Sequence, residues 1–306
     1  MSSTKKLWLG LTALLVTSFA ALLWVGKLVH QQAPPLPSAV MTSGEETLFT
    51  GEDIELGKQI WQSIGGQQLG SIWGHGALLA PDWSADWLHR ESVAMQEILA
   101  RDEGVADYAA LDAVRQAAID ARVKEELRTN TWNADTGVIQ VSPLRARAMM
   151  VVSAHYMSLL SNDPATAKLR ETYAMRDGTV ADIDHRRAVN AFFWWTAWAT
   201  TANRPDSTIS YTQNWPYDPV AGNTPTPANF MWSVFSILFL ILGIGLLVWH
   251  HQRQMHDAPL PVAPARDPLL DLKPTPSQKA TAKYFWTVVG LFLVQILLGA
   301  TTAHYQ

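Results

Sequence analysis

The stretch GGQQLGSIWGHGALLAPDWSADWLHRE, residues 65–91, lies between two segments with a helical pattern and is among the most distinctive parts of the chain. Its glycines free the backbone for tight turns. Its three tryptophans, Trp73, Trp83 and Trp87, are large side chains that require a pocket. We therefore expect an ordered loop that packs against helices, with the indole rings filling space inside a domain.

Helical patterns surround this stretch on both sides. Before it, residues 51–64 have apolar side chains at helical spacing and acidic side chains in the first turn, where the helix dipole favours them. The pattern continues in residues 84–100, 108–127, 144–160 and 182–202. The last of these segments is apolar around nearly its whole circumference, which indicates burial or contact with a membrane or partner. The sequence predicts a mainly α-helical domain.

Three apolar stretches, residues 7–25, 230–249 and 284–303, each have about the twenty residues that a helix needs to cross a bilayer. None of them contains a formal charge. A cleaved signal peptide is the alternative for the first stretch, which is long for a signal peptide and lacks a convincing small-residue cleavage site. The sequence predicts a membrane protein with three transmembrane helices.

The positive charges predict how these spans are oriented. Lys5 and Lys6 precede the first span, and Lys and Arg are in excess after the second, so both flanks are predicted to be cytoplasmic. The intervening residues 31–228 hold 15 Lys and Arg against 24 Asp and Glu, a net charge of −9. Such an acidic domain is a poor nucleic-acid binder. We expect a multi-pass protein of the bacterial inner membrane, with its large domain on the periplasmic face.

The chain contains no cysteine. This excludes disulfides, thiolate metal sites, thiol catalysis and covalent attachment of c-type haem through a C-x-x-C-H motif. The exported domain must therefore be held together by its core alone. On each side of it we expect a connector: residues 31–43 as a short extended tether, and the Pro-rich residues 258–276 as a cytoplasmic linker.

A second distinctive stretch, NRPDSTISYTQNWPYDPVAGN at residues 203–223, leads into the second apolar stretch. Together with residues 65–91 it resembles the exported domain of quinol-dependent nitric oxide reductases. The order of anchor, helical domain, span, basic loop and span is also similar to theirs. The resemblance covers essentially the whole chain.

The resemblance implies a fold for the exported domain. In this family the domain is cytochrome c-like but lacks haem. Here a helix that ends at Gly65 and Gly66, a glycine-rich loop and then Ala80, Pro81 and Asp82 follow the cytochrome c order without its cysteines.

The expected organisation has five parts. They are a transmembrane anchor (1–30), an exported haem-free cytochrome c-like domain (31–228), a second transmembrane helix (229–250), a cytoplasmic Pro-rich loop (251–283) and the first helix of a catalytic portion (284–306). The resemblance implies that this portion belongs to the haem-copper oxidase superfamily and holds two haems b and a non-haem iron. Their ligands lie on later helices in the family. We therefore expect a truncation, split gene or fragment that binds no cofactor or metal, has no catalytic residue and is inactive alone.

His304, in the motif AHYQ at the outer end of the third span, is the candidate quinol-binding residue. The family uses a histidine in a similar motif to contact quinol, with a partner carboxylate one turn later, beyond Gln306. Imidazole suits this role, since it can hydrogen-bond a quinol hydroxyl and accept its proton near neutral pH. The alternative is an interfacial histidine that caps the helix end.

Other histidines are interpreted as structural. His75, in the motif GHG, mimics a haem ligand, but without cysteines or a second ligand it is expected to be a hydrogen-bonded residue in a turn. His89 is expected to pair with neighbours on its own helix.

Three functions are open at this point. The first is the N-terminal part of a quinol-dependent nitric oxide reductase, which reduces two NO to N2O with electrons from membrane quinol. Its partners would be quinol, the lipid bilayer and the remainder of the catalytic subunit, with no nucleic acid. The alternatives without catalytic activity are a membrane-anchored exported sensory domain and a structural subunit beside a separately encoded catalytic subunit.

Overall fold

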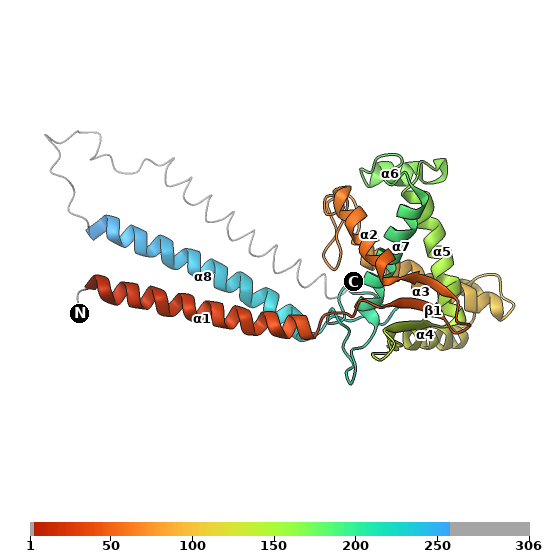
Figure 1. Cartoon of the computed structure of the whole chain (residues 1–306), viewed down its shortest axis with the longest axis horizontal. Coiled ribbons are helices and arrows are strands. Elements are labelled where there is room, and N and C mark those ends of the chain that lie inside the picture. The colour runs from red at the N-terminus through yellow and green to blue at the C-terminus, as the bar shows by residue number, and fades with distance from the viewer. Residues whose placement is uncertain (1–2, 258–306) are drawn as a thin grey trace. The chain divides into compact units, whose positions relative to one another are not determined.

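The computed structural model describes residues 3–257 (Figure 1). Helix α1 (Ser3–Gln31) begins this part of the chain, helix α8 (Pro227–Asp257) ends it, and a mainly helical domain comes between them in the sequence. Both helices are long and apolar enough to cross a membrane, over Trp8–Gln31 and Pro227–Arg253. Two of the three predicted spans therefore have a suitable helix, and the third, residues 284–303, lies outside the described residues.

Helix α8 continues past residue 250, where the second span was predicted to end. The sequence HHQRQMHD that completes it contains no proline or glycine, and the first such residue is Pro259. Residues 251–257 are thus helical, although they were expected to begin the Pro-rich loop. The remainder of that loop lies outside the described residues.

Five helices build most of the domain, and each predicted helical segment overlaps one of them. They are α2 (Gly51–Ser63), α3 (Trp83–Asp102), α4 (Ala113–Arg128), α5 (Pro143–Leu159) and α7 (Ile183–Thr201). Shorter connections are made by α6 (Ala167–Thr172) and by the 3₁₀ turns η1 (Tyr108–Ala110) and η2 (Pro164–Thr166). The prediction of a mainly helical chain is confirmed.

The starts of these helices follow from capping residues. Thr50 caps α2 in a reciprocal capping box, and the carboxylates of Asp82 and Asp182 accept backbone amide hydrogens at the starts of α3 and α7. Helix α5 begins with Ser142 as its cap and Pro143 in the first turn. Thr, Asp and Ser side chains accept hydrogen bonds from the free amides of a first turn. Proline suits the same turn because it has no amide hydrogen that needs a partner. The sequence therefore sets where each helix begins.

The predicted helix over residues 108–127 is interrupted. The turn η1 ends at Ala110, Leu111 is extended, and α4 begins only at Ala113. The side chain of Asp112 accepts hydrogen bonds from the backbone amides of Val114 and Arg115. A carboxylate in this position caps a new helix rather than continuing an old one, which explains the break.

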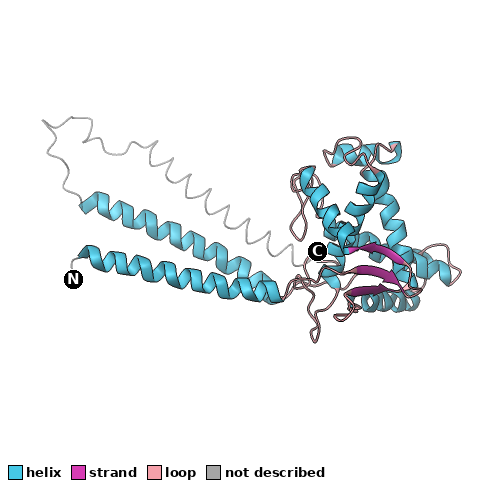
Figure 2. Ribbon diagram, viewed as in Figure 1, coloured by secondary structure: helices cyan, strands magenta, loops and turns pink. Residues whose placement is uncertain are grey.

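A three-stranded sheet adds to the helices (Figure 2). The middle strand β1 (Ala39–Thr42) pairs antiparallel with β2 (Thr47–Thr50) and parallel with β3 (Val138–Val141). The prediction that residues 31–43 form only a tether is therefore wrong for their last part. Val40 is fully buried, so β1 belongs to the domain core.

Helix α7 is the centre of the core and packs against α2, α3 and α5. Its side chains Phe192, Phe193, Trp194 and Trp198 are each at most 4% exposed. A helix that is apolar all round has to be covered on every side. Of the alternatives that the sequence left open for this segment, burial or contact with a membrane or partner, the structure shows burial within the domain.

The crossing of α2 and α7 depends on one glycine. A Cβ added at Gly57 would lie 2.0 Å from the carbonyl oxygen of Ala188 and 2.9 Å from the Cβ of Phe192. The two helices can approach this closely only because residue 57 has no side chain. Phe192, which lies at this crossing, also lines the pocket described below.

Candidate functional site

His304, the residue that the sequence selects for ligand chemistry, lies outside the described residues. Within residues 3–257, no group of three or more His, Cys, Asp or Glu side chains is placed to hold a metal ion. The described features that bear on function are the aromatic interior of the domain and the two distinctive stretches, residues 65–91 and 203–223.

Aromatic rings fill the interior beside α3 and α7. The ring of Trp83 stacks on Phe193 with centroids 5.5 Å apart, and the ring of Trp87 stacks on Tyr156 at 5.1 Å. Trp83 and Trp87 are each 2% exposed, whereas Trp73 is only half-buried at the edge. Two of the three tryptophans expected to fill the interior therefore do so completely. Stacked rings from α3, α5 and α7 thus occupy this part of the interior.

Haem is the group that a cytochrome c-like fold would hold, and the residues present do not fit it. Covalent attachment requires two cysteines, and the chain has none. His75, which mimics an axial ligand in the sequence, is exposed and has its ring edge-on to Trp215, with centroids 4.8 Å apart. No chemistry is therefore assigned to a haem in this domain.

The carboxylate of Asp82 organises the loop that precedes α3. One oxygen accepts hydrogen bonds from the Ser71 hydroxyl at 2.6 Å and from the Gly74 amide at 2.7 Å. The other accepts from the Ser84 hydroxyl and from the Ala85 amide, which it caps. Asp82 is 6% exposed. A single buried side chain thus fixes both the helix start and the loop geometry.

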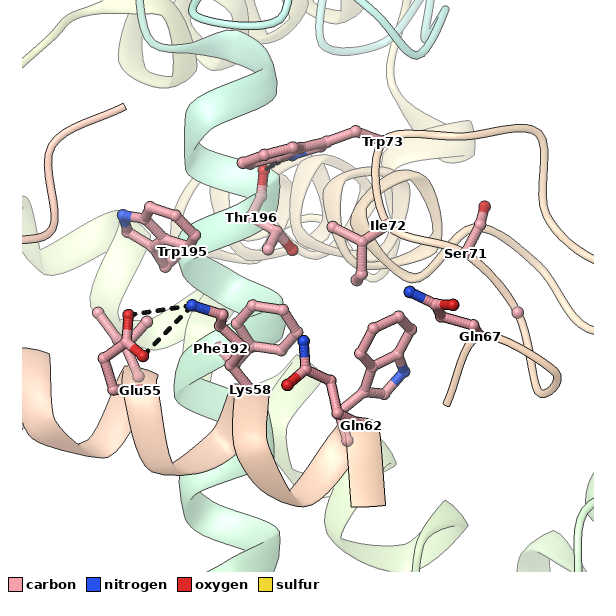
Figure 3. A pocket seen from close by; sticks show the side chains of 13 residues that line it. Glu55, Lys58, Gln62, Gln67, Ser71, Ile72, Trp73, Phe192, Trp195 and Thr196 are labelled. Carbon is pink, nitrogen blue, oxygen red and sulfur yellow. Dashed lines mark hydrogen bonds and ion pairs between the residues drawn. The ribbon is translucent and has the colours of Figure 1, made fainter. Parts of the chain in front are cut away.

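A pocket of about 510 Å³ lies between α2, α7 and residues 67–73 (Figure 3). Trp61, Phe192 and Trp195 come from the helices, and Ile72 and Trp73 come from the loop. The Nε1 of Trp73 donates a hydrogen bond of 2.9 Å to the carbonyl oxygen of Thr196, which fixes the loop to α7. The aromatic lining suits a flat apolar group.

Polar side chains lie at the same pocket. Lys58 pairs with Glu55 at 3.3 Å, and both side chains are more than 40% exposed. The side-chain amides of Gln62 and Gln67 also line the pocket (Figure 3). Among the residues that the structure describes, the lining contains no histidine, cysteine or tyrosine. The pocket therefore offers a binding surface and lacks the groups that most often transfer protons near neutral pH.

A buried ion pair connects α3 to α5. The Nε of Arg145 donates to Oε1 of Glu91 at 2.8 Å, and the two side chains are 4% and 0% exposed. The guanidinium of Arg145 also lies over the ring of Trp194, 5.3 Å from its centroid. A charge buried this deeply requires its partner, so each residue holds the other in place.

The carboxylate of Asp86 joins the buried Tyr156 to the partly exposed Arg90. Its Oδ2 accepts from the Tyr156 hydroxyl at 2.6 Å and from Nε of Arg90 at 2.7 Å. Burial, together with the Asp86 charge, raises the pKa of Tyr156 well above its usual value. Tyr156 therefore stays protonated at neutral pH and serves as a structural donor.

His89 joins α3 to the second distinctive stretch. Its Nδ1 lies 2.9 Å from Oδ2 of Asp218, 129 residues away. The expectation that His89 pairs on its own helix is wrong. The hydrogen bond to Asp218 raises the pKa of His89, although partial burial opposes it. The geometry therefore favours a protonated His89 imidazole that is paired with the buried carboxylate of Asp218.

Residues 203–223 have little regular structure and are held by side chains. The guanidinium of Arg128 donates to the side chain of Asn203 at 2.8 Å and to the backbone carbonyl of Thr208 at 2.6 Å. The amide of Asn130 donates to the carbonyl of Asn203 at 2.8 Å. This segment is thus fixed to the end of α4 by polar contacts.

The comparisons with known proteins agree with this architecture. Residues 37–217, more than half of the chain, match the family model for the cytochrome c-like domain of the nitric oxide reductase NorB. No match was found among curated proteins. The matched range includes the sheet, the aromatic interior and most of both distinctive stretches. The chain therefore belongs to the NorB family of nitric oxide reductases.

Proposed function

We propose that this chain is the N-terminal part of a quinol-dependent nitric oxide reductase, in which membrane quinol supplies the electrons. The observation that carries the proposal is a cytochrome c-like domain without cysteine, whose interior is filled by stacked aromatic rings and whose chain continues into candidate spans. A domain without haem cannot pass electrons, so they must enter by another route. A membrane-embedded protein can meet quinol directly in the bilayer.

The stoichiometry of this reaction is balanced. One quinol and two NO give one quinone, one N2O and one water. The quinol is oxidised by two electrons and releases two protons, which are the electrons and protons that NO reduction consumes. In the complete enzyme, two haems b and a non-haem iron would supply the redox chemistry.

We propose that His304 contacts the quinol hydroxyl and accepts its proton. The resemblance of AHYQ to the family motif supports this role, as does the predicted place of His304 at the outer end of a span. Imidazole can hold the hydrogen bond and titrate in the required range. Loss of such a general base is expected to lower the rate about 10²-fold.

The test is His304→Ala in a complete enzyme that carries this segment, assayed with quinol and with an artificial electron donor. We expect loss of quinol-driven NO reduction, with the haem spectrum and the artificial-donor activity retained. Unchanged quinol turnover would remove His304 from the site, and loss of haem would make its role structural. If the complete protein reduced no NO with either donor, a sensory or structural role would replace the enzyme.

The domain between the two described spans is proposed to carry no haem. The purified chain, incubated with haem and then desalted, should show no Soret band. A stable Soret band that disappears in His75→Ala would overturn this part of the proposal.

The proposed orientation places this domain on the periplasmic face of the inner membrane. The excess of Lys and Arg after residue 250 supports it. Alkaline phosphatase fused at Pro264 should be inactive, because that position is expected in the cytoplasm, whereas a fusion at residue 136 should be active. The opposite pattern would reverse the orientation.

A further inference from the structure

The loop that Asp82 organises ends in an apolar tip of two leucines. Leu78 is 98% exposed and Leu79 is 57% exposed. They lie between Ala77 and Ala80, whose backbone N–H and C=O are joined by a hydrogen bond of 2.9 Å. The tip is therefore a closed turn that presents two leucine side chains to the outside.

The exposure of these leucines follows from a rigid loop. The amide of Gly76 donates to the Ser71 hydroxyl at 2.8 Å, and the amide of Gly74 donates to the buried carboxylate of Asp82. At the base, the Trp83 amide donates to the carbonyl of Ser71 at 2.9 Å. A loop fixed in this way cannot fold its leucines inward, so their exposure points to a contact beyond the domain.

Hydrogen bonds connect the two junctions between the domain and its candidate spans to one segment, residues 203–223. After α1, the side chain of Gln32 accepts from the guanidinium of Arg204 at 2.7 Å. Before α8, the backbone amide and the hydroxyl of Thr226 donate to the main-chain and side-chain oxygens of Gln213 at 3.2 and 3.0 Å. Residues directly adjacent to a span are expected at the membrane surface, so Arg204 and Gln213 are expected on the membrane-facing side of the domain.

The leucine loop is attached to this same segment. The Nε1 of Trp215 donates to the carbonyl of Gly74 at 3.1 Å, and its ring contacts His75. Trp215 is two positions after Gln213, and Leu78 is four positions after Gly74. The loop that carries the apolar tip is therefore held, through Gly74 and His75, by the segment that contacts both span junctions.

We propose that Leu78 and Leu79 insert into the lipid interface and fix the domain against the membrane surface. Residues 59–81 contain no Asp, Glu, Lys or Arg, so the insertion buries no formal charge. Trp73, Trp215 and the half-exposed Tyr217 lie in the adjacent segments, and Trp and Tyr are enriched at membrane interfaces. A lipid surface is the occupant that this position and composition favour.

The test uses the absence of native cysteine, which makes any introduced thiol the only one. Leu78→Cys in the complete 306-residue chain is labelled with a polarity-sensitive fluorophore and reconstituted into vesicles of phosphatidylcholine and phosphatidylglycerol. The matched control is Val114→Cys, since Val114 is 80% exposed at the far end of α4 from Arg128. We expect a blue-shifted emission at position 78 and at least about threefold stronger quenching by nitroxide-labelled lipid than at position 114.

Two outcomes would overturn the proposal. Quenching of the position 78 label by aqueous iodide, equal to that at position 114, would leave the tip in solvent. Protection from both iodide and nitroxide lipid would mean that protein covers it. Leu79→Cys provides a second reading, with the same direction and a smaller effect because Leu79 is less exposed.

Discussion

The helical core and the loop layer of the same domain are held by different forces. The helical core comprises α2, α3, α5 and α7, and its largest buried side chains include Trp87, Trp194 and Trp198. The loop layer comprises residues 65–82 and 203–223, where Asp82, Arg128 and other polar side chains hold irregular backbone. The core is stabilised mainly by the hydrophobic effect, and the loop layer mainly by hydrogen bonds.

This difference predicts two responses to mutation. Core side chains contact several helices at once, so a change there should lower the free energy of unfolding of the whole domain. A loop-layer side chain satisfies a few nearby backbone groups, so the effect of its loss should be smaller and local.

The largest effect is expected from Glu91→Ala. It leaves the Arg145 guanidinium buried without its carboxylate, which should lower the free energy of unfolding by about 3–5 kcal/mol. Chemical unfolding of the chain in detergent, followed by tryptophan fluorescence, measures this loss. Asp102→Ala is the control, because Asp102 pairs with Arg147 in an exposed ion pair and its removal should change little. Equal losses in the two variants would contradict the prediction.

Gly57→Ala should push α2 and α7 apart at the point where they cross. The new methyl group would lie against helix backbone that has no rotamer to move, so we expect a loss of about 2–3 kcal/mol. Gly44→Ala is the matched control, since its Cβ would meet only the Thr42 hydroxyl oxygen at 3.7 Å. Unfolding midpoints in denaturant provide the comparison. A Gly57→Ala protein as stable as the control would show that the helices are not in this close contact.

Asp82→Ala tests the loop layer. Loss of the cap and of the loop hydrogen bonds should lower stability by about 1–2 kcal/mol. Amide exchange at Gly74 and Gly76 should accelerate more than exchange within α5. Asp112→Ala, which also removes a helix cap, should leave exchange at these glycines unchanged. If amide exchange accelerated equally across the domain, Asp82 would stabilise the whole domain and not only the loop layer.

The smallest effect is expected at the contact between the two regions. The hydrogen bond to Asp218 raises the pKa of His89 above its usual 6.5. A raised pKa in the folded state contributes stability below pH 6.5, and that contribution is lost as the pH rises through the folded pKa. His89→Gln should therefore lower the unfolding temperature slightly at about pH 5 to 6 and not at about pH 9. His185→Gln is an exposed control, and a pH-independent effect of His89→Gln would exclude this linkage.

Much of the fold could be predicted from local signals. The apolar spacing of residues 51–64 and 182–202 predicted α2 and α7 closely, because amphipathic or fully apolar helices carry their own periodicity. The strand β1 was missed, since four residues after a Pro-rich segment give almost no pattern. This segment is a strand because it pairs with β3, about a hundred residues later in the chain.

The candidate site was less predictable for the same reason. The tryptophans of residues 65–91 indicated a packed interior, but the pair of Glu91 and Arg145 joins residues 54 positions apart. His89 has acidic and basic neighbours on its own helix, so the sequence favoured a local partner over Asp218. Asp82 could have been found, because an aspartate after a proline and before a helical pattern is a capping signal.

The sequence by itself determined the helical class, the two apolar segments that the structure describes as long helices, the absence of thiol chemistry and the similarity to nitric oxide reductases. These features depend on composition and on spacing within a few turns. Only the tertiary structure decided which rings stack in the interior, which charges are buried together, and which leucines remain outside. Those outcomes depend on contacts between residues far apart in the chain, and side-chain periodicity carries no information about such partners.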